Sequence, residues 1–310
     1  MAAVEPPCPV SAHASRVPMD TTDVVTWRDP VPHLWLWIAC LVCLPAALIA
    51  LRRVWRWWVS GRSLPLPLDG AMPAVRWPVQ FGFLLFLGTF LLALFLGDVY
   101  ARMAAKGLLP WEPLDVPYSL SPGVFLAQIV PPLVGLAVVL RFGRGAAATV
   151  GVRAGRVWPE IVRGLGIVVI VLPLCVAGTA AGVFLMWLFR LESVEHPSFA
   201  ALREWPQWWV LLLTVLQASV LAPLGEEFLY RGILQTTLLK AVGPFRALIA
   251  TSALFAVVHV LYEPQAVSGL FILGLGLGYA AYRTRSLLAP IIAHSAFNTL
   301  MVLGTFFGGS

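Results

Sequence analysis

Charge is scarce in this sequence. Only 12% of the 310 residues are charged, whereas 59% are hydrophobic. A typical soluble domain has about 25% charged residues, so the composition argues against an ordinary globular protein. Charge-poor runs of roughly 20 residues recur along the chain, which is the length that an α-helix needs to cross a bilayer. The composition therefore predicts a polytopic membrane protein.

Cysteine is also sparse, with four residues in the whole chain. Cys40 and Cys43 form a C-x-x-C pair, but the pair lies inside an apolar stretch and no second pair accompanies it. We therefore assign the cysteines to packing and predict neither a cysteine-based zinc site nor a redox site. The first 32 residues lack the basic start and short apolar core of a signal peptide, and we interpret residues 1–32 as a mobile extracytoplasmic tail.

Apolar stretches dominate the rest of the chain. They predict eight membrane-spanning helices, at residues 33–51, 79–99, 123–141, 161–189, 208–222, 246–261, 267–282 and 287–307. The fifth stretch continues through Glu226 to about Lys240. The predicted fold class is an all-α transmembrane bundle, with N-terminal spans in residues 33–204 and a C-terminal group in residues 205–310.

Basic residues occupy every second loop between these spans. The main ones are Arg52, Arg53, Arg56, Arg62, Arg76, Arg141, Arg144, Arg153, Arg156, Arg163, Lys240, Arg246, Arg283 and Arg285. The positive-inside rule places such loops in the cytoplasm, so with eight spans both termini lie outside. Because the arginines form no continuous patch, we expect no nucleic-acid partner.

Polar groups inside the predicted spans are concentrated in the C-terminal third. A charged side chain at the centre of a bilayer costs about 2.5 to 3.5 kcal/mol, so such residues are functional candidates. The notable ones are Glu226, Glu227, Arg231, His259, His294 and Asn298.

Helical spacing separates the two adjacent acids. Glu227 and Arg231 are four residues apart, so they share a helix face and can form a supporting ion pair. Glu226 is turned about 100° away from that face and needs a partner on another helix. The available groups with matching chemistry are His259 and His294.

The other two polar positions follow the same spacing. His294 and Asn298 project side by side, and Phe255 lies one turn before His259, where its ring can restrict the imidazole. Each residue taken alone has an ordinary structural explanation. A lone histidine is often a hydrogen-bonded core residue, and a lone asparagine often joins packed helices.

Three motifs occur in order on successive apolar helices. They are Glu226-Glu227-x-x-x-Arg231, Phe255-x-x-x-His259 and His294-x-x-x-Asn298. Together they resemble the CAAX protease and bacteriocin-processing family of intramembrane proteases, which includes the type II prenyl-protein endopeptidases. All three motifs are intact, and the resemblance covers about residues 205–305. It identifies residues 205–310 as a catalytic membrane core.

The resemblance implies a membrane enzyme that hydrolyses peptide bonds in a cavity open to the cytoplasm. By this resemblance Glu226 is the general base that activates water, His259 assists it, and His294 and Asn298 stabilise the oxyanion. We expect a multi-pass protein of a bacterial inner membrane. Its expected partners are the lipid bilayer and a peptide or protein substrate presented at the membrane.

The cofactor is open at this stage, since the family is described both as metal-dependent and as using a glutamate without a catalytic metal. Glu226, His259 and His294 match a His₂Glu set for zinc or another divalent metal. Against this, no H-E-x-x-H helix is present, and a metal-bound Glu226 would leave the general base unassigned. We favour water activation by the glutamate and keep zinc as the alternative.

Two other functions could use the same polar pocket. A proton-coupled transporter commonly has paired broken helices in two similar halves, whereas the polar groups here are confined to the C-terminal third. A non-catalytic membrane scaffold would keep the pocket to bind a partner segment. Nothing in the sequence selects prenylated C-terminal peptides over bacteriocins, signal peptides or membrane-protein tails.

Overall fold

The computed structural model describes residues 77–109, 117–142 and 157–308, with scattered positions between 41 and 75. Every regular element in these ranges is helical, which confirms the predicted all-α class. Among the described residues, six helices are long and apolar enough to cross a membrane: Val79–Ala105 (α2), Pro122–Phe142 (α3), Val157–Leu188 (α5), Trp208–Val242, Pro264–Thr284 and Leu288–Phe307. They correspond to six of the eight predicted spans.

The other two predicted spans, at 33–51 and 246–261, are not matched by long membrane-crossing helices among the described residues. The span predicted at 33–51 lies mostly outside the described residues, and the tail predicted at 1–32 lies wholly outside them. The span predicted at 246–261 corresponds to α10, Pro244–Val257, whose 14 residues are fewer than a full bilayer crossing requires. The fifth span does continue past Glu226, as predicted, and ends at Val242.

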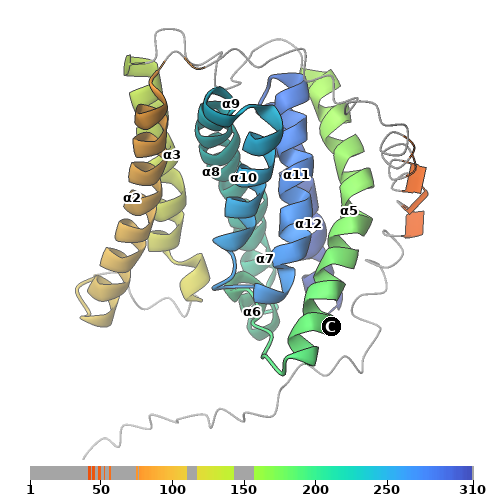
Figure 1. Ribbon diagram of the computed structural model, residues 1–310. Helices are drawn as coiled ribbons and strands as arrows, with labels where there is room; N and C mark the ends of the chain where they lie inside the picture. The colour runs from red at the N-terminus through yellow and green to blue at the C-terminus, as the bar shows by residue number, and fades with distance from the viewer. Residues whose placement is uncertain are drawn as a thin grey trace, which may run out of the picture.

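The helices alternate in direction through the bundle (Figure 1). α3, α9 (Thr236–Val242) and α11 (Val267–Thr284) end, and α5, α10 and α12 (Leu288–Gly308) begin, at the end of the bundle drawn at the top. Arg141, Lys240, Arg246 and Arg283 lie in the terminal turns at this end. These four basic residues therefore share one side, and the assignment of that side to the cytoplasm stays a prediction.

The helix from Trp208 to Val242 changes its register twice. It consists of α7 (Trp208–Thr214), the π-helical η3 (Val215–Leu221), α8 (Ala222–Glu227), the π-helical η4 (Phe228–Gln235) and α9. In η3 the amide of Ala222 donates to the carbonyl of Gln217, five residues back. The next donor in this register would be residue 223, but Pro223 has no N–H. The carbonyl of Ala218 is thus left without its helical partner.

α5 and the C-terminal helices pack closely through small residues. A Cβ on Gly164 of α5 would lie 2.7 Å from the carbonyl oxygen of Ala289 at the start of α12. A Cβ on Gly274 of α11 would lie 3.0 Å from the Cβ of Ser252 on α10. The close approach of α10 at Gly274 shows that this glycine allows two helices to pack together.

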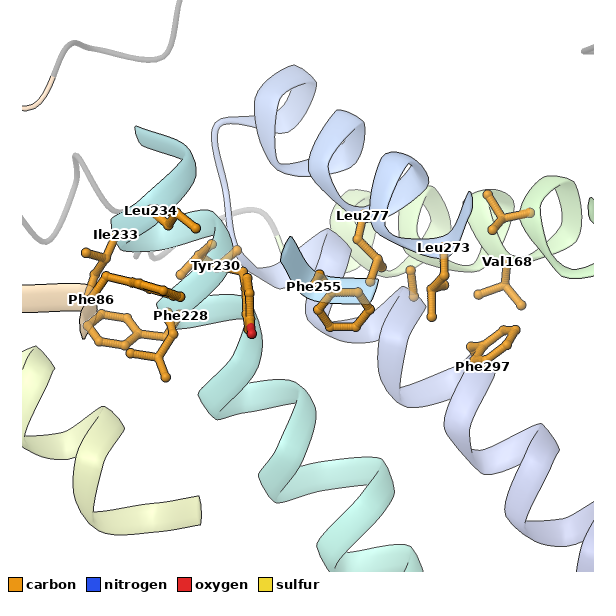
Figure 2. Close-up of a cluster of buried hydrophobic side chains, with 14 of the residues drawn as sticks. Phe86, Val168, Phe228, Tyr230, Ile233, Leu234, Phe255, Leu273, Leu277 and Phe297 are labelled. Atoms are coloured by element: carbon orange, nitrogen blue, oxygen red, sulfur yellow. The ribbon is translucent and has the colours of Figure 1, made fainter. Parts of the chain in front are cut away.

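The core is a set of aromatic and aliphatic side chains from α2, α3, α5, η4, α10, α11 and α12 (Figure 2). Phe86, Phe228, Tyr230, Phe255 and Phe297 are among its buried members. Many large apolar side chains on the outer helix faces are exposed, as expected for surfaces that contact lipid. Polar side chains gather instead inside the bundle beside this core, where the three motifs meet.

Candidate active site

Glu227 and Arg231 form the predicted supporting pair. Both side chains have no exposed surface, and Nη1 of Arg231 lies 2.9 Å from Oε1 of Glu227. A second nitrogen, Nη2, donates to the carbonyl of Gly274 at 3.2 Å. The guanidinium also lies 4.7 Å from the centre of the Phe255 ring. The i, i+4 spacing on one helix makes this pair predictable from the sequence.

Glu227 has a second partner, on another helix, that helical spacing does not predict. Nδ1 of His294 lies 2.9 Å from the same Oε1 atom of Glu227, and the His294 side chain is only 4% exposed. A carboxylate oxygen can only accept, so Nδ1 of His294 donates and Nε2 of a neutral ring carries the lone pair. No local spacing signals this contact, because the two residues are 67 positions apart.

Glu226 differs from its neighbour in exposure and in contacts. Its side chain keeps 30% of its surface accessible, and Oε2 lies 3.8 Å from Nε2 of His294. This separation is too long for a hydrogen bond, and a carboxylate facing the lone pair of Nε2 has no proton to share. One water molecule can donate to both atoms. Of the two imidazoles predicted as partners of Glu226, His294 is the one whose ring nitrogen lies beside its carboxylate in the described residues.

His259 follows the end of α10, beside Phe255. Its Nδ1 lies 2.7 Å from the carbonyl oxygen of Phe255, which fixes the ring proton on Nδ1 and leaves Nε2 free. The Phe255 ring centre lies 5.1 Å from that of His259 and 5.7 Å from that of His294. The predicted support of His259 by Phe255 is thus present. Within the described residues no hydrogen bond or ion pair joins His259 to Glu226.

Asn298 lies one turn after His294 on α12, as predicted, but its amide is already engaged. Nδ2 donates to the carbonyl of Ala218 at 2.7 Å. This acceptor is the one that Pro223 leaves without a helical donor. One N–H of the carboxamide is used in this way to join α12 to η3, and one remains. Its predicted role at an oxyanion stays a prediction.

The predicted zinc set consists of Glu226, His259 and His294. In the part of the chain that the structure describes, no group of three or more His, Cys, Asp or Glu side chains is arranged to hold a metal ion. Glu226, His259 and His294 therefore do not form a ready-made His₂Glu site in this arrangement. The involvement of a metal stays a prediction.

Comparisons with known proteins agree with the motif assignment. A model of the family described as type II CAAX prenyl endopeptidase Rce1-like matches residues 206–300. An uncharacterized 24.3 kDa protein of Escherichia coli is 34% identical over 96 residues, which are 30% of this chain and 44% of that protein. The chain thus matches less than half the length of this relative. No solved structure shows a significant match. These findings confirm, for residues 206–300, the resemblance to the CAAX protease family that the three motifs predict.

Proposed function

We propose that this protein is an intramembrane endopeptidase in which Glu226 activates water. The observation that carries the proposal is the pair of acceptor atoms, Oε2 of Glu226 and Nε2 of His294, held 3.8 Å apart beside the buried Glu227 and Arg231. Glu226 is the accessible member of the acid pair, whereas Glu227 is neutralised by Arg231 and is fully buried. The family match over residues 206–300 supports the same class of activity.

The geometry supports a direct hydrolytic step. A water molecule donates one hydrogen to Glu226 and the other to Nε2 of His294, while Glu227 holds the opposite side of the imidazole ring. Glu226 removes a proton as the water oxygen attacks the peptide carbonyl, and the protonated carboxyl then delivers this proton to the leaving amine. In the neutral ring Nε2 of His294 is an acceptor, so His294 orients the water in this scheme. No step passes through a metal.

The proposed substrate is a peptide presented at the membrane, such as a C-terminal tail. The test uses purified protein in proteoliposomes and three peptides: a farnesylated CAAX peptide, the same peptide without the lipid, and a signal peptide. Mass spectrometry of the products identifies the bond that is cut. Cleavage of the lipidated peptide alone would assign a prenyl-dependent substrate, and cleavage of the signal peptide alone would assign a different branch of membrane-peptide processing.

Replacing Glu226 with Gln removes the base and keeps the shape of the side chain. We expect the cleavage rate to fall by about 10² to 10⁴-fold, because a positioned general base contributes a factor of this size. Thermal unfolding should stay unchanged, since Glu226 is partly exposed and its loss leaves no charge unpaired. A Glu226→Gln protein that cleaves as fast as the wild type would overturn the proposal. Wild-type protein that binds these peptides without cleaving them would indicate a scaffold.

A further inference from the structure

Peptide hydrolysis needs hydrogen-bond donors at the oxyanion, and most donors at this site are already used. Nδ1 of His294 donates to Glu227, and Nδ1 of His259 lies against the carbonyl of Phe255. One N–H of Asn298 is taken by Ala218. Only the second N–H of Asn298 is left among the predicted groups. An effective oxyanion site commonly has more than one donor.

Tyr230 is a donor that no predicted role includes. It lies four residues after Glu226 on the same helix, so the two side chains lie within one turn of each other. The residue is only 3% exposed. Its hydroxyl has no hydrogen-bond partner within the described residues, and it is not among the buried oxygen atoms that are completely shielded. The hydroxyl is therefore unpaired and still accessible, on the helix turn that follows the proposed base.

The ring of Tyr230 is held firmly between two other aromatic rings. Its centre lies 5.4 Å from that of Phe86 at 71°, and 5.3 Å from that of Phe255 at 89°. Edge-to-face contacts of this kind fix ring orientation. In Figure 2 the Tyr230 oxygen lies at the edge of the hydrophobic cluster rather than within it. Phe255 also contacts both imidazoles, so one set of rings positions the phenol and the two histidines.

We propose that the hydroxyl of Tyr230 is a further catalytic group, which donates a hydrogen bond to the oxyanion formed when the Glu226-bound water attacks the substrate. The phenol keeps its proton throughout, so the step adds no proton transfer to the proposed hydrolysis. A neutral donor held in a site of low dielectric stabilises the developing negative charge more than the uncharged carbonyl. This inference rests on the proposed function. The alternative is that Tyr230 only fills the core, as Phe would.

Tyr230→Phe separates these two roles, because it removes the hydroxyl and keeps the ring. We expect kcat to fall by about 10² to 10³-fold, the range for loss of one oxyanion donor, with KM changed less than about threefold. The matched control is Tyr279→Phe on α11, where a half-buried tyrosine lies outside the site. This control should cleave at the wild-type rate. A Tyr230→Phe protein with wild-type kcat would overturn the inference.

A binding measurement shows whether a loss of kcat in Tyr230→Phe has a purely structural cause. The probes are a peptide phosphinate, which mimics the tetrahedral oxyanion, and the corresponding reduced-amide peptide, which has no such oxygen. Tyr230→Phe should weaken phosphinate binding by about the factor lost in kcat and leave reduced-amide binding unchanged. Equal weakening of both probes would show a structural role and overturn the inference.

Glu226→Gln, assayed in parallel, distinguishes a failure of the proposed role of Tyr230 from a failure of the proposed protease function. If Glu226→Gln is inactive and Tyr230→Phe has wild-type activity, only the role of Tyr230 fails. If Glu226→Gln has wild-type activity, the proposed function fails together with the role of Tyr230.

Discussion

At the scale of single residues, two adjacent carboxylates have opposite environments. Glu227 is fully buried and is held by Arg231 and His294, whereas Glu226 keeps 30% of its surface accessible. The rotation of about 100° between neighbouring helix positions produces this difference. A buried charge that is neutralised serves structure, and an accessible one beside an imidazole can take up a proton. Adjacent positions thus supply the support and the reactive group.

Replacing Glu227 with Gln should destabilise the protein, in contrast to Glu226→Gln. The change leaves the buried Arg231 charge without its carboxylate, and breaking a buried ion pair costs about 3 to 5 kcal/mol. Thermal unfolding in detergent, with Glu226→Gln as the matched control, measures the difference. Equal unfolding temperatures for the two variants would contradict the assignment of Glu227 as the structural member of the pair.

The sequence predicts contacts within one helix better than contacts between helices. The Glu227–Arg231 pair and the Phe255–His259 contact follow from i, i+4 spacing, and both are present. The contact between Glu227 and His294 joins residues 67 positions apart and depends on how η4 and α12 pack. Tyr230 carries no spacing signal that separates it from a core aromatic residue. Its unpaired hydroxyl is evident only in the folded arrangement.

At the scale of elements, Pro223 links a local irregularity to the site. The missing N–H frees the carbonyl of Ala218, which binds Asn298 and thereby joins η3 to α12. Hydropathy predicts that this segment is helical, and it does not predict the π-helical register, because the register depends on Pro223 together with a tertiary partner. Hydropathy also does not predict where α10 ends, because apolar residues continue past the helix end at Val257.

The loop that follows α10 contains a second group of ionisable residues. Glu263 lies between α10 and η5 (Pro264–Ala266), outside the long apolar helices. Burial, together with the nearby Glu195 carboxylate, raises the pKa of Glu263 from its ordinary 4.5 to about 7. Burial lowers the pKa of His196, in the adjoining loop, to about 4, and His259 adds to this effect. Both pKa shifts favour the uncharged forms of Glu263 and His196.

These pKa shifts predict that the contributions of Glu263 and His196 to protein stability depend on pH in opposite directions. Because the folded state raises the pKa of Glu263, its contribution to stability is complete below about pH 4.5 and is lost as the pH rises through about 7. Glu263→Gln should therefore raise the unfolding temperature at pH 8 and have little effect at pH 4.5. Allowing for the partial exposure of Glu263, we expect Glu263→Gln to raise the free energy of unfolding by about 1 to 2 kcal/mol at pH 8. An equal effect at both pH values would contradict the proposed burial of this carboxyl.

At the scale of the whole molecule, composition and charge pattern predict the architecture more fully than the site. The helical class and six of the eight spans agree with the structure, and Arg141, Lys240, Arg246 and Arg283 share one end of the bundle. The family match covers only residues 206–300, but α5 packs directly against α11 and α12 through Gly164 and Gly178. The N-terminal helices therefore complete the bundle around the site.

In the proposed mechanism Glu226 and His294 act on one water molecule as a unit, and a double-mutant cycle in kcat/KM measures this coupling. The four proteins are the wild type, Glu226→Gln, His294→Gln and the double variant, assayed in proteoliposomes on the same cleavable peptide. Groups that act as a unit are strongly non-additive, so we expect the double variant to be within about threefold of the slower single variant. A double variant whose loss equals the product of the two single losses would contradict the account.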